Sequence, residues 1–517
     1  MFNNVFANNA RIAATMTTTE NGHAAASTTG SAVLDLYGQV GGLRDQDFDS
    51  RIKPLFDAAI SDDKLLAAKT MFYARDARGG VGERNLFRQL LRYAAINHPD
   101  MVRPNLKLVP FYGRWDDLYA LVGTPLERDA FQVIIDQYYL DICCYNVSKP
   151  VSIMAKWLKS CNTSSKESRK LGRLTCKYLE MDERSYRKSL SKFRERIAIV
   201  EAKMSANEWK EIEYDKLPSR AGMIYRGAFR KHDEERYNAY IESVQKGEKK
   251  INTAMNTPQD LVHAYTGDNY YRLSGEYDGW YHIEEDPTIE AMWKNLPDFV
   301  ESDENILCMV DTSGSMYGRP IEVSTGLGMY FAQKNRGAFH NLFMTFSTYP
   351  DFVALDDNKS FVENLRTTFN ADWGGSTDLN LACKEMLNFA IKHHVPQKDM
   401  PTRLIIISDM EINAATNGYG VPSHSFNDPL HIEELKEMYN RAGYSVPQVI
   451  YWNVESRHNH FQTRSDVKGT MLASGSSPAV FKAVMAMDDL EVTPLDAMLE
   501  VLNGERYAGI KLEETGA

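Results

Sequence analysis

Two short runs that each end before an aspartate place the strongest constraint on how this chain can fold. Ile306–Val310 is wholly apolar and precedes Asp311, while Arg403–Ser408 contains the apolar run Leu404–Ile407 and precedes Asp409. A strand with no polar face fits a parallel sheet that helices cover on both sides. This part of the chain is therefore expected to be an α/β domain.

Strand-like and helix-like segments alternate after Asn305. The expected strands are 306–310, 341–346, about 352–355, 403–408, 447–452 and about 469–473, and the expected helices are 320–334, 360–369, 378–393, 431–441 and 478–486. Such alternation predicts a doubly wound, Rossmann-like sheet, in which ligands bind beyond the carboxyl ends of the strands.

The first half of the chain shows helical periodicity instead. The expected helices are 64–75, 85–96, 115–122, 127–142, 151–160, 166–180, 185–204, 206–213 and 233–246. Helices of this length with short connections predict an α-solenoid of stacked helix pairs. The Gly- and Tyr-containing segment 266–287 marks a boundary. The expected organisation is a flexible leader over 1–30, a helical domain over 31–287 and the α/β domain over 288–517.

Length and composition narrow the class of protein. A chain of 517 residues exceeds the size of one hydrophobic core, and 43% hydrophobic with 25% charged residues excludes disordered and fibrous classes. No apolar run approaches the roughly 20 residues that span a bilayer, so no membrane partner is expected. The six cysteines form no CxxC pair, which favours a reducing, cytoplasmic location.

Side chains whose oxygen atoms can bind a metal ion follow the expected strands, at the edge of the sheet where parallel strands end. They are Asp311, Ser313 and Ser315 after the 306–310 strand, Thr377 in the loop GGSTD, and Asp409 after the 403–408 strand. Hydroxyls and few carboxylates suit Mg²⁺, or another divalent cation such as Mn²⁺, and leave the ion a position open to an outside acidic group. The sequence therefore predicts a metal site that captures a ligand.

The strings DTSGS, GGSTD and SDME resemble, in order and spacing, the metal-ion-dependent adhesion site (MIDAS) of von Willebrand A domains. The resemblance implies a von Willebrand A domain with the five side chains above as its metal ligands. A chance turn followed by a helix N-cap would explain one of these strings, but not three on successive strand ends.

Two charged, glycine-containing segments stand out in the helical half. Residues 72–84 (FYARDARGGVGER) could suggest a phosphate-binding loop, but they lack GK[ST] and follow no strand. We interpret the segment as a tight corner between helices whose charged side chains form fixed ion pairs. Residues 112–118 (YGRWDDL) are interpreted in the same way.

These two segments, with YRK at 186–188, LPSR at 217–220, WNV at 452–454 and SGSSP at 474–478, resemble a family of domains of unknown function found in plants, fungi and phages. The resemblance runs from about Thr19 to Lys511. That family is similar in architecture to the Ro autoantigen (TROVE module) proteins, which are rings of HEAT-like repeats closed by a von Willebrand A domain. Ro proteins bind small non-coding RNAs outside the ring and the 3′ ends of misfolded RNAs in its central hole, so the resemblance implies a ribonucleoprotein.

The charge of the chain is unevenly distributed. Its net charge is −11, yet residues 149–250 hold 25 Lys and Arg against 15 Asp and Glu. The candidate RNA contacts are Lys170, Arg173, Lys177, Arg184, Arg187, Lys188, Lys192, Arg194 and Arg196. They could neutralise phosphates, while Tyr178, Tyr186 and Phe193 could stack on bases or pack inside. A solvated helix face is the open alternative, because acidic residues are interleaved with the basic ones.

Three functions are compatible with these features. The favoured one is a non-enzymatic RNA-binding protein of Ro-like type. The second is a protein-interaction scaffold in which the metal captures a partner's carboxylate and RNA plays no part. A metal-dependent hydrolase is least supported, because none of the twelve histidines lies in a metal loop and such chemistry needs a positioned base. His458 and His460 are expected to be surface or loop residues.

Overall fold

The computed structural model of the chain describes residues 14–267, 283–300, 305–345, 351–371, 373, 379–413, 431–487 and 490–513. It divides into two compact units, each built from distant stretches of sequence. The sheet unit comprises residues 1–63 and 253–504, and the helical unit comprises residues 64–252 and 505–517. This division differs from the boundaries expected at residues 30 and 287, because segments from both sides of the helical stretch pack with the sheet.

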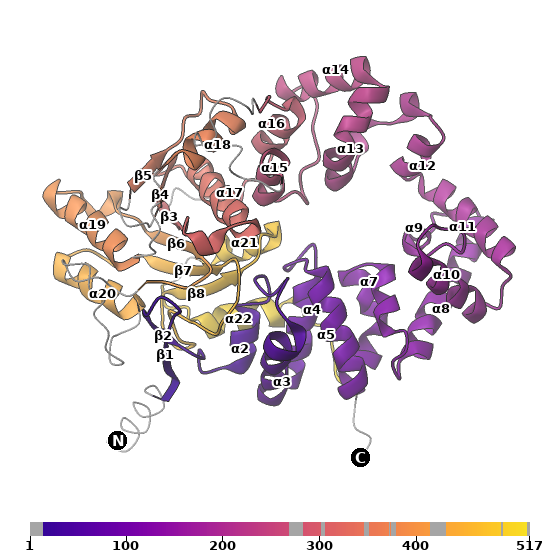
Figure 1. Ribbon diagram of the computed structural model, residues 1–517, viewed down its shortest axis with the longest axis horizontal. Coiled ribbons are helices and arrows are strands. Elements are labelled where there is room, and N and C mark those ends of the chain that lie inside the picture. The colour runs from indigo at the N-terminus through magenta and orange to yellow at the C-terminus, as the bar shows by residue number, and fades with distance from the viewer. Residues whose placement is uncertain are drawn as a thin grey trace. The chain divides into compact units, whose positions relative to one another are not determined.

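One mixed sheet of six strands organises the sheet unit, in the order β5-β4-β3-β6-β7-β8 (Figure 1). The strands are β3 (Ile306–Val310), β4 (Leu342–Thr345), β5 (Asp351–Ala354), β6 (Arg403–Ser408), β7 (Gln448–Asn453) and β8 (Thr470–Ser474). All neighbouring pairs are parallel except β4 with β5. Every residue of β3, β6 and β7 is buried, which confirms the prediction of a sheet covered on both faces.

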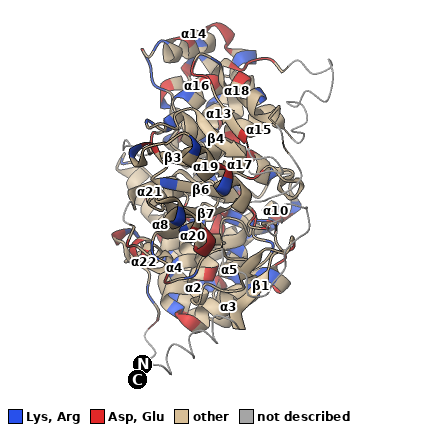
Figure 2. Cartoon of the chain, turned by 90° about the vertical axis from the view of Figure 1, so that its left-hand side faces the viewer, with Lys and Arg blue, Asp and Glu red and all other residues tan. Residues whose placement is uncertain are grey.

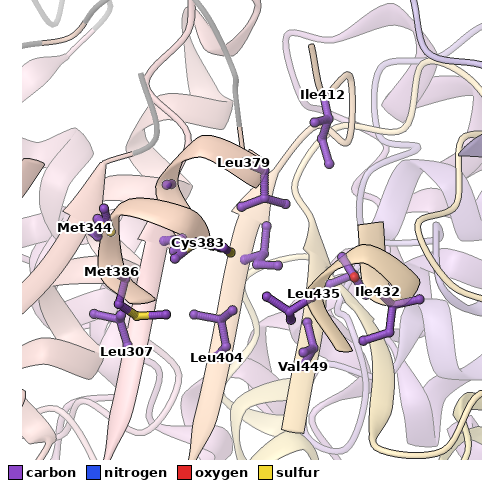
Figure 3. Close-up of a cluster of buried hydrophobic side chains, with 14 of the residues drawn as sticks. Leu307, Met344, Leu379, Cys383, Met386, Leu404, Ile412, Ile432, Leu435 and Val449 are labelled. Carbon is purple, nitrogen blue, oxygen red and sulfur yellow. Dashed lines mark hydrogen bonds between the residues drawn. The ribbon is translucent and has the colours of Figure 1, made fainter. Parts of the chain in front are cut away.

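Helices cover the two faces of this sheet. On one face, α19 (Leu379–Lys392) and α20 (His431–Ala442) pack on side chains such as Leu307, Leu404 and Val449 (Figure 3). The other face carries α17 (Arg319–Lys334) against β3 and α21 (Pro478–Ala486) against β8. The alternation of side chains along each strand thus supplies two apolar faces to two helical layers.

The residues before Lys64 belong to the sheet unit. The strands β1 (Met16–Thr18) and β2 (Ala24–Ala26) form an antiparallel hairpin, and Ala26 pairs with Phe461 of the same unit. The helices α2 (Ala32–Tyr37) and α3 (Lys53–Asp62) follow. The expected flexible leader is therefore wrong for residues 14–30, because β2 is fully buried; residues 1–13 lie outside the described part.

Four further α-helices lie in the described part of the sheet unit. They are α15 (Pro258–Thr266), α16 (Pro287–Lys294), α18 (Phe361–Phe369) and α22 (Pro494–Asn503). The first of them packs on α17, and α16 packs on α18. Sequence periodicity showed that such helices bury one face, but it did not identify the surface against which they bury it.

The helical unit is an array of helices. Its members are α4 (Lys64–Arg75), α5 (Arg84–Asn97), α6 (Pro99–Val102), α7 (Val109–Tyr112), α8 (Glu127–Asn146), α9 (Met154–Trp157), α10 (Lys166–Tyr178), α11 (Glu183–Ile197), α12 (Val200–Ser205), α13 (Ser219–His232) and α14 (Glu234–Gln245). The packed pairs are close in sequence, such as α4 with α5, α10 with α11 and α13 with α14. Packing between sequence neighbours is typical of a solenoid.

Three expected helices are shorter than predicted. The 185–204 segment is broken at Ala198, whose φ of 52° ends α11 in the left-handed region. The 151–160 segment forms only the single turn of α9, and the 206–213 segment forms only a 3-10 turn over Trp209–Glu211. No glycine or proline signals the break at Ala198, so local composition could not predict it.

The two charged corners of the helical unit are paired with each other. The Arg75 guanidinium donates to Asp117 at 2.7 Å, and both side chains are almost fully buried. The other oxygen of Asp117 accepts from Arg88 at 2.7 Å, while Asp76 forms an ion pair with Arg506. The interpretation of these segments as ion-paired corners is therefore confirmed for Arg75, Asp76 and Asp117. The Arg75–Asp117 pair joins the two corners, whereas Arg88 and Arg506 come from outside them.

Candidate functional site

The loop after β3 gathers three of the predicted metal ligands, Asp311, Ser313 and Ser315. The Asp311 N–H donates to the carbonyl of Ile407 on β6 at 2.9 Å, which extends the strand pairing into this loop. One Asp311 carboxylate oxygen accepts from the Ser313 N–H at 2.9 Å, and the other accepts from the Ser408 hydroxyl at 2.6 Å. The hydroxyls of Ser313 and Ser315 lie 3.0 Å apart. One turn thus presents a carboxylate and two hydroxyls.

Asp409 begins the loop after β6, the strand beside β3. Its carboxylate is buried, and one oxygen accepts from the backbone N–H of Glu411 at 3.0 Å. The other oxygen contacts the guanidinium of Arg457, on the loop after β7. A cationic side chain of the protein therefore already balances part of the charge of Asp409.

The buried carboxylate of Asp311 is in an environment that disfavours its charge. Burial, with a further contribution from the negative charge of Asp409, raises the pKa of Asp311 to about 7, although the hydrogen bonds from Ser408 and Ser313 lower it. The nearby hydroxyl of Thr312 is buried and has no hydrogen-bond partner within the described residues. A divalent cation would relieve the repulsion and could satisfy a free oxygen.

The fifth predicted ligand, Thr377, lies outside the described residues. The other four come from the ends of two adjacent parallel strands, as the sequence predicted. We call Asp311, Ser313, Ser315 and Asp409 the Asp311 cluster.

Sequence reasoning missed the residues that surround Asp409. Arg457 contacts Asp409 itself. His458 and His460 contact Glu411, and their Nδ1 atoms lie 3.3 and 2.8 Å from its Oε1. The usable signal was that 403–408 and 447–452 were both expected to be parallel strands, whose following loops open on one edge. The sequence did not show that β6 and β7 are neighbouring strands, and the contacts between their loops depend on that.

A second candidate site lies on α10 and α11 of the helical unit. Their N-termini are capped by the side chains of Ser165 and Asp182, and the buried Gly172 lets α10 approach the backbone at Ser160 and Cys161. Eight of the predicted RNA contacts are exposed on these helices, and we call them the basic surface: Lys170, Arg173, Lys177, Arg184, Arg187, Lys188, Lys192 and Arg196.

Arg194 differs from the other predicted RNA contacts. Its guanidinium is half-buried and donates to the carbonyls of Ala155 and Leu158 at 2.8 and 3.0 Å. These bonds hold the short helix α9, so we leave Arg194 out of the basic surface. Arg173 is exposed but forms an ion pair with Glu183 at 3.1 Å.

The aromatic side chains of these helices pack inside the unit. Tyr186 and Phe193 are buried. Tyr178 is half-buried and stacks on Phe131, with ring centroids 4.1 Å apart. Of the two roles considered for these rings, packing therefore applies to Tyr186 and Phe193.

The first half of α10 borders an open groove of about 690 Å³. It is lined by Lys166, Glu167, Arg169, Lys170 and Arg173. Four of the five side chains are cationic, so the groove favours anions. Elsewhere, charges of both signs are interspersed along the side of the chain seen in Figure 2.

Comparison with known proteins places the chain in a family. A model described as a domain of unknown function (DUF2828) matches residues 19–133 and 149–303, slightly more than half of the chain. The chain belongs to this family. A second model, described as a domain of unknown function (DUF7788), matches residues 305–507.

Two individual proteins are similar over most of the chain. Uncharacterized protein L728 of Acanthamoeba polyphaga mimivirus is 26% identical over 528 residues, which cover 95% of this chain and 87% of that protein. The crystal structure of the Deinococcus radiodurans RO (RSR) protein has a TM-score of 0.48 and 13% identity, covering 88% of this chain and 99% of that one. Within the described residues, no helix is long and apolar enough to cross a membrane.

The two sites offer different chemistry. The Asp311 cluster offers hard oxygen donors that could hold a divalent cation. The basic surface offers exposed cations without a buried carboxylate or an aromatic platform of its own, and such a surface suits the backbone of a polyanion.

Proposed function

We propose that this chain is an RNA-binding protein without enzymatic activity, and that its basic surface binds small non-coding or misfolded RNA. The observation that carries the proposal is the exposure of the eight basic-surface side chains on two packed helices of a chain with net charge −11. Between Lys166 and Ile197, eleven Lys and Arg stand against five Asp and Glu, a local net charge of +6. A phosphate backbone is the polyanion that such a region neutralises.

The shape of the region supports the same proposal. The groove beside α10 adds Lys166 and Arg169 to the cations that a bound strand could meet. The rings of Tyr186 and Phe193 are buried, so binding would depend on charge more than on base stacking. An RNA partner also agrees with what the resemblance to Ro-type proteins implies.

The Asp311 cluster is proposed to bind Mg²⁺, or Mn²⁺ in its place, with Thr377 as a further ligand. Its carboxylates and hydroxyls are the donors that these ions prefer. The raised pKa of Asp311 and the unsatisfied hydroxyl of Thr312 support the fit. When bound, the ion supplies a Lewis-acidic position that an outside carboxylate or phosphate oxygen could complete.

A protein-interaction scaffold is the second candidate function. It is favoured by Tyr317, whose ring is 56% exposed two residues after Ser315. An exposed tyrosine is a common anchor at protein interfaces. In this alternative the ion captures a carboxylate of a partner protein, and RNA plays no part.

Co-purification separates the two functions. The chain is purified with and without nuclease and with and without Mg²⁺, the associated RNA is sequenced, and protein partners are identified by mass spectrometry. The RNA proposal predicts enriched RNA and binding of a labelled single-stranded RNA at low salt. Absence of RNA binding at low salt, with a protein partner that survives nuclease and is lost in Asp311→Ala, would replace it by the scaffold.

A further inference from the structure

Glu411, His458 and His460 form a second group of metal-binding side chains, separate from the Asp311 cluster. Glu411 lies on the loop after β6, and the two histidines lie on the loop after β7. Their ligand atoms all lie within 4.8 Å of one another. We infer that this group, which we call the Glu411 cluster, binds a divalent transition-metal ion of the zinc class.

The separations within the Glu411 cluster are close to those that a bound ion requires. Zinc bonds to imidazole nitrogen and carboxylate oxygen are roughly 2.0–2.2 Å long, so two ligand atoms on a tetrahedral ion lie about 3.3 Å apart. The Nδ1 atoms of His458 and His460 are 3.3 and 2.8 Å from Glu411 Oε1. Small rotations of the side chains would therefore suffice to receive the ion.

Glu20 and Asn21 contact the residues of the Glu411 cluster in the way that neighbouring groups orient metal ligands. Glu411 Oε2 accepts a hydrogen bond of 2.8 Å from the Glu20 N–H, and the Glu411 carbonyl accepts one of 2.7 Å from the Asn21 side chain. The Glu20 carboxylate lies 3.6 Å from Nε2 of His458, the ring nitrogen that does not face Glu411. A carboxylate on the far nitrogen of a ligating histidine orients the ring and raises its basicity.

One side of the Glu411 cluster is buried, and the other side is open to solvent. The side chains of Glu411 and His460 are 2% and 12% exposed, whereas His458 and Glu20 are 44% and 51% exposed. The buried pair would fix the ion, and the open side would admit it and leave a fourth position for water. The positive charge of Arg51 opposes the ion, but its guanidinium is held by Asn459 at 2.6 Å and by the carbonyl of His458 at 2.8 Å.

The donor set distinguishes this site from the one proposed for Mg²⁺. Imidazole nitrogens select transition metals, whereas Mg²⁺ prefers oxygen donors alone. Without an ion, the histidines would serve only as hydrogen-bond partners that stabilise the buried Glu411 carboxylate. These two roles predict different responses to added zinc.

The test measures Zn²⁺ binding to the metal-stripped full chain by competition with a chromophoric chelator, and Co²⁺ binding by its visible absorption. The variants are His460→Asn, the double variant His458→Asn/His460→Asn and Glu411→Gln. The exposed His393→Asn, in the same unit, is the matched control, and thermal melting checks that each variant is folded.

We expect one Zn²⁺ per chain, at least tenfold weaker binding in His460→Asn, and unchanged binding in both His393→Asn and Asp311→Asn. Equal Zn²⁺ binding by the wild type and the double variant would overturn the inference. Loss of Zn²⁺ binding in Asp311→Asn with retention in the double variant would also overturn it, because it would place the ion in the Asp311 cluster. RNA binding is measured separately, so these outcomes do not depend on the proposed function.

Discussion

The hydroxyl of Ser408 donates a hydrogen bond of 2.6 Å to the carboxylate of Asp311 and thereby joins the end of β6 to the end of β3. Burial, with a further contribution from Asp409, raises the pKa of Asp311 from 3.8 to about 7. Because the folded pKa lies above the unfolded one, the metal-free fold loses stability as the pH rises from 3.8 to about 7.

Replacing Asp311 should therefore separate stability from metal binding. Without metal, we expect Asp311→Asn to be more stable than the wild type at pH 8, by a few kcal/mol, with a smaller advantage at pH 5. Added Mg²⁺ at pH 8 should raise the melting temperature of the wild type only. Differential scanning fluorimetry measures both effects, and an equal response of the two proteins to Mg²⁺ would exclude Asp311 as a ligand.

Arg457 should oppose metal binding, because its guanidinium contacts the Asp409 carboxylate. We expect Arg457→Gln to bind Mg²⁺ several-fold more tightly, measured by isothermal titration calorimetry, since a positive charge beside the ion is removed. Arg441→Gln, at an exposed pair with Glu437, is the control and should not change the affinity. Weaker binding in Arg457→Gln would instead assign Arg457 the role of positioning Asp409.

The pairing of the two charged corners predicts a large effect on stability. Asp117→Asn leaves Arg75 buried without its carboxylate, so we expect the helical unit to lose about 3–5 kcal/mol. Asp129→Asn removes the exposed pair with Arg103 and should cost less than about 1 kcal/mol. The stability of the two variants is compared by urea unfolding, which is followed by circular dichroism. Similar urea midpoints for both variants would show that the buried pair does not stabilise the unit.

Much of the sheet unit could be predicted because its strands carry strong local signals. The apolar runs before Asp311 and Asp409 fixed both the parallel sheet and the edge at which these carboxylates lie. The contacts of Arg457, His458 and His460 could not be predicted, because they depend on β7 lying beside β6, and strand order has no local signature.

The organisation of the chain was harder to predict than its elements. The helix α3 has the amphipathic pattern of any surface helix, and nothing in that pattern shows that it packs with the sheet unit while α4 begins the helical unit. The burial of Ala24–Ala26 likewise depends on the distant Phe461. For the basic surface, the sequence predicted exposed cations. Only the structure shows that Arg194 instead donates hydrogen bonds that hold α9.

The salt dependence of RNA binding tests the central claim most directly. The triple variant Lys170→Gln/Lys188→Gln/Lys192→Gln is compared with Lys384→Gln/Lys392→Gln/Lys398→Gln, which removes the same charge from exposed lysines of the sheet unit. Fluorescence anisotropy of a labelled single-stranded RNA is measured over a range of salt concentrations. We expect the first variant to bind at least tenfold more weakly at low salt, with a log–log salt slope shallower by about 2, and the second to match the wild type. Identical affinities and slopes for the wild type and both variants would contradict RNA binding by the basic surface.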